Sequence, residues 1–338
     1  MQPTLVYHYR AHSNHPPVVT ADLSGKTVVV TGGNSGIGLH TAKHFATMNP
    51  GKLIIACRSE EKGRAAAAEI QQETGFERTE VRILDLAKFS SVREFADKFE
   101  KEEERLDILV ANAGVALFDR RITADGWEET LQVNALSTLL NCITLLPVMI
   151  KTYQSNPGVH PRIITVTSTT HYDVRLDNEI VDSPNPLRTL SEAESINMTQ
   201  RYSESKLFAI FIARSLANVL EKTPIIATSV DPGFCSGSDI FREYNAVARF
   251  FMRLMSFVIG HTSEQGSRRL VWAALQEDTD SLRGGFVGPV KVVEPSDYAV
   301  SEEGVRAQAR LWENFIEELS KVDPKIPEIL KSVKVASQ

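Results

Sequence analysis

The sequence predicts a single α/β domain, a doubly wound parallel sheet with helices on both faces. Short runs rich in β-branched residues alternate with longer amphipathic stretches along the middle of the chain. Such alternation is typical of parallel strands joined by helical crossovers, which cover both faces of the sheet. A glycine-rich turn joins the first run to the first long stretch. Of the 338 residues, 42% are hydrophobic and 24% are charged, as in a globular protein.

Six buried strands and five long helices are expected. The strands are expected at residues 27–30, 53–56, 81–84, 106–110, 162–166 and 225–230. The helices are expected at residues 36–48, 59–73, 90–104, 127–151 and 201–220. Short apolar runs favour strands, whereas a longer amphipathic pattern with helical spacing favours helices. We expect the domain to span residues 24–322, between an N-terminal extension (1–23) and a C-terminal tail (323–338).

Two segments interrupt this rhythm and are interpreted as substrate loops. Residues 173–200 combine acidic residues with prolines, asparagines and serines, which favours an inserted loop. The second loop, residues 234–262, contains an apolar stretch at 247–260 with Arg249 and Arg253 four positions apart. That stretch is interpreted either as an amphipathic helix over an apolar substrate or a membrane surface, or as a helix packed in the core or at a dimer interface.

Charge and cysteine content narrow the class of partner. The net charge of −6 argues against a nucleic-acid surface, because phosphate binding needs a basic face. The three cysteines, Cys57, Cys142 and Cys235, have spacings that suit neither a metal site nor a disulfide framework. The sequence lacks a signal-like N-terminus and an apolar run long enough to span a bilayer. We therefore expect a cytoplasmic protein with a small lipophilic substrate, and leave a homodimer and a peripheral membrane contact open.

The turn after the first strand is the first candidate site. It runs through Thr31, Gly32, Gly33, Asn34, Ser35, Gly36, Ile37 and Gly38. Glycines let the backbone approach a pyrophosphate closely, and the free amides and dipole of a helix N-terminus favour an anion. The spacing, Gly-x-x-x-Gly-x-Gly, differs from the common dinucleotide fingerprint. Its place between a strand and a helix predicts a dinucleotide site more strongly than a merely structural turn.

Arg58, at the end of the second strand, indicates which dinucleotide binds. An acidic side chain here would accept hydrogen bonds from the ribose hydroxyls of NAD, whereas arginine suits the 2′-phosphate of NADP(H) through charge-assisted bonds. Arg58 therefore favours NADP(H), against the alternative of an ordinary surface arginine.

Tyr202 and Lys206 form the candidate catalytic pair. Four positions apart in an expected helix, their side chains leave the same face. A phenol with a pKa near ~10 is a poor base at neutral pH, and a neighbouring ammonium stabilises the phenolate. Taken alone, the pair could equally be an exposed helix pair.

Two further polar residues support the pair by their position. Ser168 follows the fifth expected strand, at the sheet edge where ligands bind in α/β folds, although Thr167, Thr169 and Thr170 offer competing hydroxyls. Asn134 lies in a mostly apolar helix, so it is either a structural hydrogen-bonding residue or part of a water-linked proton relay.

Together these motifs resemble the short-chain dehydrogenase/reductase family, in the family's order and over about residues 24–290. The motifs that carry the resemblance are the turn 31–38, Asp85, Asn112-Ala113-Gly114, Asn134, Ser168, Tyr202 with Lys206, and Pro232-Gly233. The strand end Ala56-Cys57-Arg58, the insertion before Tyr202 and the tail segment 294–298 further resemble its retinol-dehydrogenase-like subgroup.

The resemblance implies a Rossmann-type fold and an oxidoreductase that uses NADP(H) on a lipophilic carbonyl or alcohol. It implies that Tyr202 is the general acid/base, Lys206 its activator and ribose ligand, Ser168 the carbonyl-orienting hydroxyl and Asn134 the anchor of a proton relay. It also implies that Asp85 and Leu86 contact the adenine side, that Asn112, Ala113 and Gly114 line the adenosine side, and that Pro232 and Gly233 flank the nicotinamide.

The sequence departs from the family pattern at two places. Ala111 stands where a first asparagine is usual, and the threonine often found shortly after Pro-Gly is missing, with Ser236 and Ser238 nearby. These departures concern the contact with the nicotinamide amide more than the chemistry. The alternative function is a catalytically silent NADP(H)-binding scaffold or sensor. Such proteins typically lose a catalytic side chain, and here all four are present.

Overall fold

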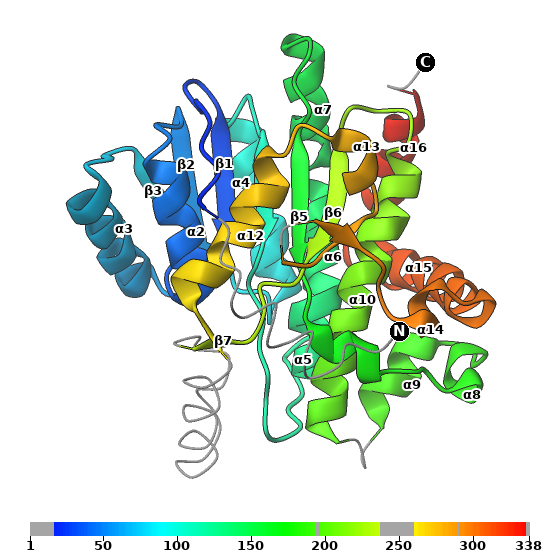
Figure 1. Ribbon diagram of the computed structural model, residues 1–338. Coiled ribbons are helices and arrows are strands. Elements are labelled where there is room, and N and C mark those ends of the chain that lie inside the picture. Colours follow the sequence, from blue (N-terminus) through cyan, green and yellow to red (C-terminus); the bar gives the residue numbers. More distant parts are fainter. Residues whose placement is uncertain (1–16, 194–196, 237–259, 290, 336–338) are drawn as a thin grey trace.

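The computed structural model describes residues 17–193, 197–236, 260–289 and 291–335, and its centre is a twisted sheet between two layers of helices (Figure 1). In the described residues the sheet has the strand order β10-β9-β6-β5-β4-β1-β2-β3, antiparallel between β10 and β9 and parallel elsewhere. Its strands are β1 (Thr27–Thr31), β2 (Lys52–Cys57), β3 (Thr79–Ile83), β4 (Ile108–Ala111), β5 (Arg162–Val166), β6 (Ile226–Val230), β9 (Phe286–Val287) and β10 (Val292–Val293). A separate parallel pair joins β7 (Cys235–Ser236) to β8 (His261–Thr262).

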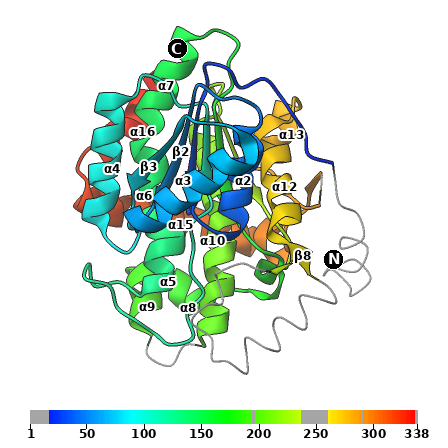
Figure 2. The ribbon, with the colours of Figure 1, turned by 90° about the vertical axis from the view of Figure 1, so that its left-hand side faces the viewer.

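Helices cover both faces of the sheet, as Figure 2 shows from the side. One layer contains α2 (Gly36–Ala46), α3 (Glu60–Thr74), α12 (Ser263–Leu275) and α13 (Thr279–Leu282). The other contains α4 (Phe89–Glu102), α6 (Ser137–Thr144), α7 (Leu146–Ser155), α10 (Met198–Val219), α15 (Glu302–Val322) and α16 (Ile326–Val335). The predicted doubly wound α/β fold is therefore confirmed.

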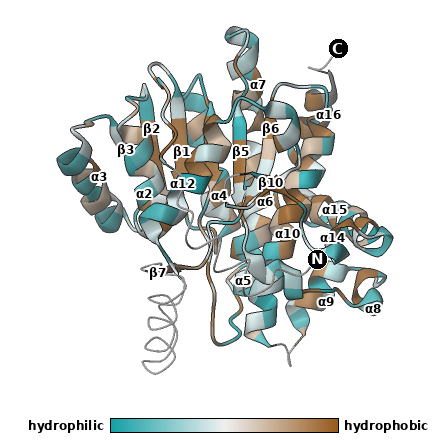
Figure 3. Ribbon diagram, in the orientation of Figure 1, coloured by the Kyte–Doolittle hydropathy of each residue, from teal (hydrophilic) through white to brown (hydrophobic). Residues whose placement is uncertain are grey.

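Successive side chains of the central strands enter opposite layers. Val28 and Val30 of β1 pack in the cluster beneath α2 and α12, whereas Val29 packs in the cluster beneath α4 and α6. Because both faces are covered, these strands are buried along nearly their whole length and are mostly apolar, without regular alternation. Figure 3 shows this as hydrophobic colour along the strands and hydrophilic colour on outer helices such as α3 and α8 (Asn178–Val181).

The six expected strands and five expected helices are all present, with one change in shape. The stretch predicted as one helix at 127–151 is broken into α5 (Glu129–Leu131), a π-helical turn η1 (Gln132–Leu136), α6 and α7. A π-turn inserts one residue into the helical register and is frequent at functional sites. Asn134 lies at its centre.

The described part of segment 173–200, residues 173–193 and 197–200, is mostly helical rather than the predicted loop. After the short 3₁₀ helix η2 (Thr169–Asp173) it forms α8 and α9 (Pro186–Glu192), and α10 begins at Met198 rather than at 201. Leu187 and Leu190 of α9 are fully buried or nearly so, and the amide of Leu187 donates to Asn314 Oδ1 at 2.9 Å. The insertion is therefore a packed part of the domain, held partly by α15.

The C-terminal boundary also differs from the prediction. Residues 326–335, placed by the sequence in a tail, form α16. Ile326 and Val333 are fully buried in the same cluster as α4 and α6. An amphipathic helix with an apolar face of this kind belongs to the core.

One helical stretch among the described residues, Glu129–Ser155, is long and apolar enough to cross a membrane by length and composition. In its most apolar window, 94% of the residues are buried inside the fold, as expected for a core helix of this architecture. The apolar stretch 247–260 lies outside the described residues except for Gly260.

Candidate active site

The glycine turn forms a tight backbone cradle between β1 and α2. Gly32 has φ of +65°, which L side chains rarely adopt, and a Cβ at Gly38 would lie 2.3 Å from the carbonyl oxygen of Gly32. In the described structure the Ser35 side chain at the N-cap does not cap the first turn of α2. The first amides of the helix are therefore left for an anion, as a pyrophosphate site requires.

Polar contacts brace this turn against the end of β4. Asn112 Nδ2 donates to the carbonyl oxygen of Thr31 at 3.0 Å, and the Ala113 amide donates to Thr31 Oγ1 at 3.0 Å. Thr31 and Gly38 thus hold the turn from behind, while Gly32 lies at the cavity surface.

Beyond the ends of β2 and β3, the cavity reaches charged side chains. Arg58 and Lys62 are exposed and line the cavity, and Ser59 caps α3 by accepting from the Lys62 amide at 3.3 Å. Asp85, after β3, lines the same region and accepts from the Ala87 amide at 3.1 Å. Arg58 after β2 and Lys62 in the first turn of α3 therefore present two cations here, the chemistry that suits a phosphate monoester.

Tyr202 and Lys206 occupy one face of α10. The Lys206 Nζ lies 5.4 Å from the centroid of the Tyr202 ring and donates to the carbonyl oxygen of Val166 at 3.0 Å. Burial lowers the pKa of Lys206 to about 8, against the opposing charge of Asp231. Its ammonium form therefore persists at neutral pH, next to the phenol.

Asn134 supports this pair from the π-turn. Its Nδ2 donates to the carbonyl oxygen of Val115 and to Ser205 Oγ, both at 2.9 Å, and its Oδ1 accepts from the Val115 amide at 2.8 Å. The side chain thus ties the segment after β4 to α10. These contacts are the structural hydrogen bonds of the first alternative for Asn134, and the proton relay stays a prediction.

Ser168 follows β5 and is the N-cap of the 3₁₀ helix η2. Its Oγ accepts from the Thr170 amide at 3.3 Å and lines the cavity together with Tyr202. Thr167 also lines the cavity, but its hydroxyl is already engaged, because Oγ1 donates to the carbonyl oxygen of Lys206 at 2.6 Å. Thr169 and Thr170 also line the cavity.

One cavity of about 560 Å³ brings most of the predicted site residues together. Its volume is in the range of small-molecule and cofactor sites. The predicted residues that line it are Gly32, Asn34, Ser35, Gly36, Ile37, Arg58, Asp85, Leu86, Asn112, Ala113, Gly114, Ser168, Tyr202, Lys206, Pro232 and Gly233. Among the described residues on the predicted list, Thr31, Gly38 and Asn134 lie behind this surface rather than on it.

The cavity also has lining residues that the motifs did not identify. Val115, Glu129, Val133, Val166, Thr199, Phe234 and Cys235 belong to this group. Val115 and Phe234 directly follow recognised motifs, so adjacency was a usable signal. Val133 is likewise adjacent to Asn134, whereas Glu129 reaches the cavity through helix packing, which no local pattern reveals.

A buried polar cluster holds the segment after β6. The Gly233 amide donates to Asp231 Oδ1 at 3.1 Å, and Arg269 donates to the Asp231 carbonyl oxygen at 3.1 Å and to His261 Nε2 at 3.0 Å. Arg269 and His261 are nearly fully buried. This cluster fixes Pro232 and Gly233 at the cavity.

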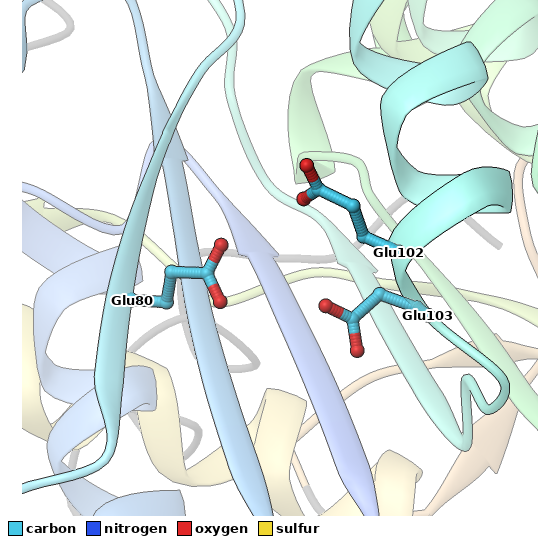
Figure 4. A group of neighbouring side chains, drawn as sticks. All are labelled: Glu80, Glu102 and Glu103. Carbon is cyan, nitrogen blue, oxygen red and sulfur yellow. The ribbon is translucent and has the colours of Figure 1, made fainter.

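Three carboxylates that do not line this cavity converge at Glu80, Glu102 and Glu103 (Figure 4). Arg82 Nε lies 2.6 Å from Glu80, and Lys52 Nζ lies 2.6 Å from Glu103, which Arg82 also contacts. The two cations account for the approach of the carboxylates, so this group is a salt-bridge network on β2, β3 and α4.

Comparison with known proteins agrees with this architecture. The sequence model for short chain dehydrogenase matches residues 26–175. The short-chain dehydrogenase anuD of Penicillium roqueforti is 35% identical over 325 residues, which cover 94% of this chain and 84% of that protein. Human dehydrogenase/reductase SDR family member 13 is 33% identical over 292 residues, 86% of this chain and 72% of that protein.

Solved structures share the fold. A Mycobacterium paratuberculosis protein superposes with a TM-score of 0.66 at 28% identity, covering 90% of this chain and 98% of its own. A Burkholderia cenocepacia short chain dehydrogenase in complex with NADP gives a TM-score of 0.57 at 23% identity, covering 79% of this chain and 97% of its own. The chain belongs to the short-chain dehydrogenase/reductase family of oxidoreductases, which use nicotinamide cofactors.

Proposed function

We propose that this protein is an NADP(H)-dependent ketoreductase or alcohol dehydrogenase that acts on a lipophilic carbonyl or alcohol. The observation that carries the proposal is the convergence of Tyr202, Lys206 and Ser168 on the same cavity as the glycine turn. An acid, a cation and a hydroxyl donor at one end and a phosphate cradle at the other are the parts that carbonyl reduction needs.

The chemistry of the chain's own residues is proton transfer and orientation. When bound, the cofactor supplies a hydride to the carbonyl carbon. Tyr202 donates its phenolic proton to the carbonyl oxygen, and the Lys206 ammonium stabilises the phenolate that remains. Ser168 donates a hydrogen bond to the same oxygen and so holds it beside Tyr202. In the oxidation of an alcohol these steps run in reverse.

Arg58 and Lys62 support NADP(H) over NAD(H). Both line the cavity beyond β2, where the 2′-phosphate of the adenosine ribose would lie. In this region Arg58 stands where an NAD site would favour an acidic side chain. The Burkholderia cenocepacia dehydrogenase, which has the same fold, was solved in complex with NADP, and this also supports NADP(H).

The apolar part of the cavity supports a lipophilic substrate. Val115, Val133, Val166 and Phe234 line it. Apolar walls with a few fixed polar groups are typical of sites that bind small lipophilic molecules.

Tyr202→Phe tests the proposal directly. We expect NADPH oxidation with a panel of lipophilic ketones to fall by about 100- to 10,000-fold, the range of general acid catalysis. NADPH binding, followed by nicotinamide fluorescence, should stay within about twofold, because the phenol oxygen contributes little to phosphate binding. Tyr153→Phe, on α7 and away from the cavity, is the matched control and should keep full activity.

Two outcomes would contradict the proposal. A Tyr202→Phe variant with wild-type turnover would remove the tyrosine from the chemistry. A wild-type protein that binds NADPH yet reduces none of the carbonyls would favour the silent scaffold instead.

A further inference from the structure

His171 links the backbone of Ser168 to the backbone of Ser296, one through each of its ring nitrogens. Its Nδ1 lies 2.7 Å from the carbonyl oxygen of Ser168, and its Nε2 lies 3.1 Å from the backbone amide of Ser296. A carbonyl oxygen only accepts and an amide N–H only donates, so the ring must carry its proton on Nδ1 and leave Nε2 bare. The imidazole is thus a neutral bridge of defined tautomer.

The surroundings favour this neutral form. His171 is fully buried, and burial lowers its pKa. Its ring lies 4.1 Å from the Tyr172 ring and 4.9 Å, edge to face, from Phe286 of β9. Packing on both sides restricts rotation of the ring, so the two hydrogen bonds are held in one geometry.

The other end of the bridge is the tail segment 294–298. Ser296 is the N-cap of α14 (Asp297–Val300) and accepts from the Ala299 amide at 3.2 Å. The Tyr172 hydroxyl donates to the carbonyl oxygen of Glu294 at 2.8 Å. Two adjacent side chains of η2 therefore attach the turn after Ser168 to this segment, which the sequence motifs single out without assigning it a role.

We propose that His171 is a positioning residue that aims the Ser168 hydroxyl at the substrate carbonyl. The inference rests on the proposed function, because it requires Ser168 to contact that oxygen. Ser168 Oγ accepts from the Thr170 amide, so its own proton is left to donate into the cavity. The direction of that proton depends on the orientation of the 168–170 turn, which the Nδ1 bond to the Ser168 carbonyl fixes.

Three substitutions separate the two halves of the bridge. In His171→Asn the amide nitrogen takes the place of Nδ1 and still donates to the Ser168 carbonyl, but the side chain is too short for Ser296. In His171→Gln the amide oxygen reaches toward Ser296 and leaves the Ser168 carbonyl without this donor. His171→Phe keeps the ring packing and removes both bonds.

We expect His171→Phe and His171→Gln to lower kcat by about 10- to 100-fold, the cost of a misplaced reacting group. His171→Asn should keep kcat within about threefold, because it loses only the hydrogen bond with Ser296 and keeps the one with Ser168. The Kd for NADPH should stay within about twofold in all three, because the phosphate cradle lies elsewhere. A kcat of His171→Gln equal to or above that of His171→Asn overturns the inference, and this comparison decides even if the Phe variant does not fold.

A double-mutant cycle with Ser168→Ala tests whether His171 acts through Ser168. Once the hydroxyl is gone, adding His171→Phe should lower kcat by no more than about twofold further, because the two residues act as one unit. Two independent losses that multiply would overturn the inference. If Ser168→Ala is impaired but His171→Phe is not, the inference alone fails. If Ser168→Ala keeps wild-type kcat, the proposed role of Ser168 fails and the inference fails with it.

Discussion

The two ends of the cavity are built in different ways. At the dinucleotide end, the site is formed mainly by glycines and backbone groups. Gly38 packs directly against the carbonyl group of Gly32 within the turn after β1. Asn112, which follows β4, holds the turn by its hydrogen bond. The turn and the helix that follows it are adjacent in sequence, so most of the site is local.

At the reactive end, buried side chains from distant segments hold the site. Arg201, the neighbour of Tyr202, is fully buried. Its guanidinium contacts Glu204 at 2.5 Å and Glu128 at 3.5 Å, and it donates to the carbonyl oxygen of Leu190 in α9. Glu128 in turn accepts from the Thr130 and Leu131 amides at the start of α5.

The comparison teaches that the two ends should fail differently. A side chain added at a glycine of the turn overlaps with neighbouring backbone, and such a substitution should abolish cofactor binding. Removing one member of the buried charge cluster leaves a buried charge without its partner. Such a substitution should disturb the alignment of α10 with α9 and α5. Substitutions at each end can therefore be told apart by what they change.

Gly38→Ala has the largest expected effect. The new Cβ would lie 2.3 Å from the Gly32 carbonyl oxygen and 2.5 Å from Asn112 Nδ2, and the first of these neighbours is backbone that cannot rotate away. We expect a loss of about 5 kcal/mol or more in the free energy of unfolding, the scale reserved for severe steric conflict. In any folded fraction, NADPH binding should be undetectable by fluorescence titration.

Gly75→Ala is the matched control at the end of α3. Gly75 has φ of +73° and open space around its Cβ position. The Gly75→Ala substitution should lower the free energy of unfolding by about 1 kcal/mol because of backbone strain, and the NADPH affinity should be unchanged. Equal losses in the two variants in chemical denaturation would show that the close approach at Gly38 costs no more than the strained φ at Gly75.

Arg201→Met tests the buried charge cluster at the reactive end. It keeps the approximate volume and removes the charge, so Glu128 and Glu204 remain buried without their cation. Removing one partner of a buried pair costs about 3–5 kcal/mol. We expect that loss in urea unfolding, together with reduced kcat and nearly unchanged NADPH affinity, since the glycine cradle is untouched.

Arg64→Met provides the comparison for an exposed pair. Arg64 and Glu60 lie four apart on α3, with 75% and 60% of their side chains exposed. Its loss should cost less than about 1 kcal/mol. An Arg201→Met variant as mild as this control would mean that the buried cluster contributes little to stability or alignment.

The same division explains what the sequence could predict. The sheet, the glycine turn and the spacing of Tyr202 and Lys206 follow from local patterns. The strands therefore lie close to their expected positions, and most of the predicted site residues line the cavity. His171 binds Ser296 across 125 positions, and neither residue carries a local signal for the other. The burial of α16 depends likewise on the face that α6 and α7 present.

Arg58→Ala has the smallest expected effect and sharpens the account of the dinucleotide end. Arg58 is exposed at the cavity edge, so its loss should leave the fold and the cradle intact. A charge-assisted hydrogen bond to a phosphate contributes about 1.5–3 kcal/mol, which corresponds to a Kd for NADPH raised by about 10- to 100-fold. The Kd for NADH, which has no 2′-phosphate, should change by less than about twofold. Arg64→Ala, in the second turn of α3 and paired with Glu60, is the control and should alter neither constant. If Arg58→Ala weakens both dinucleotides equally, Arg58 contacts a group that they share, and the preference for NADP(H) must have another source.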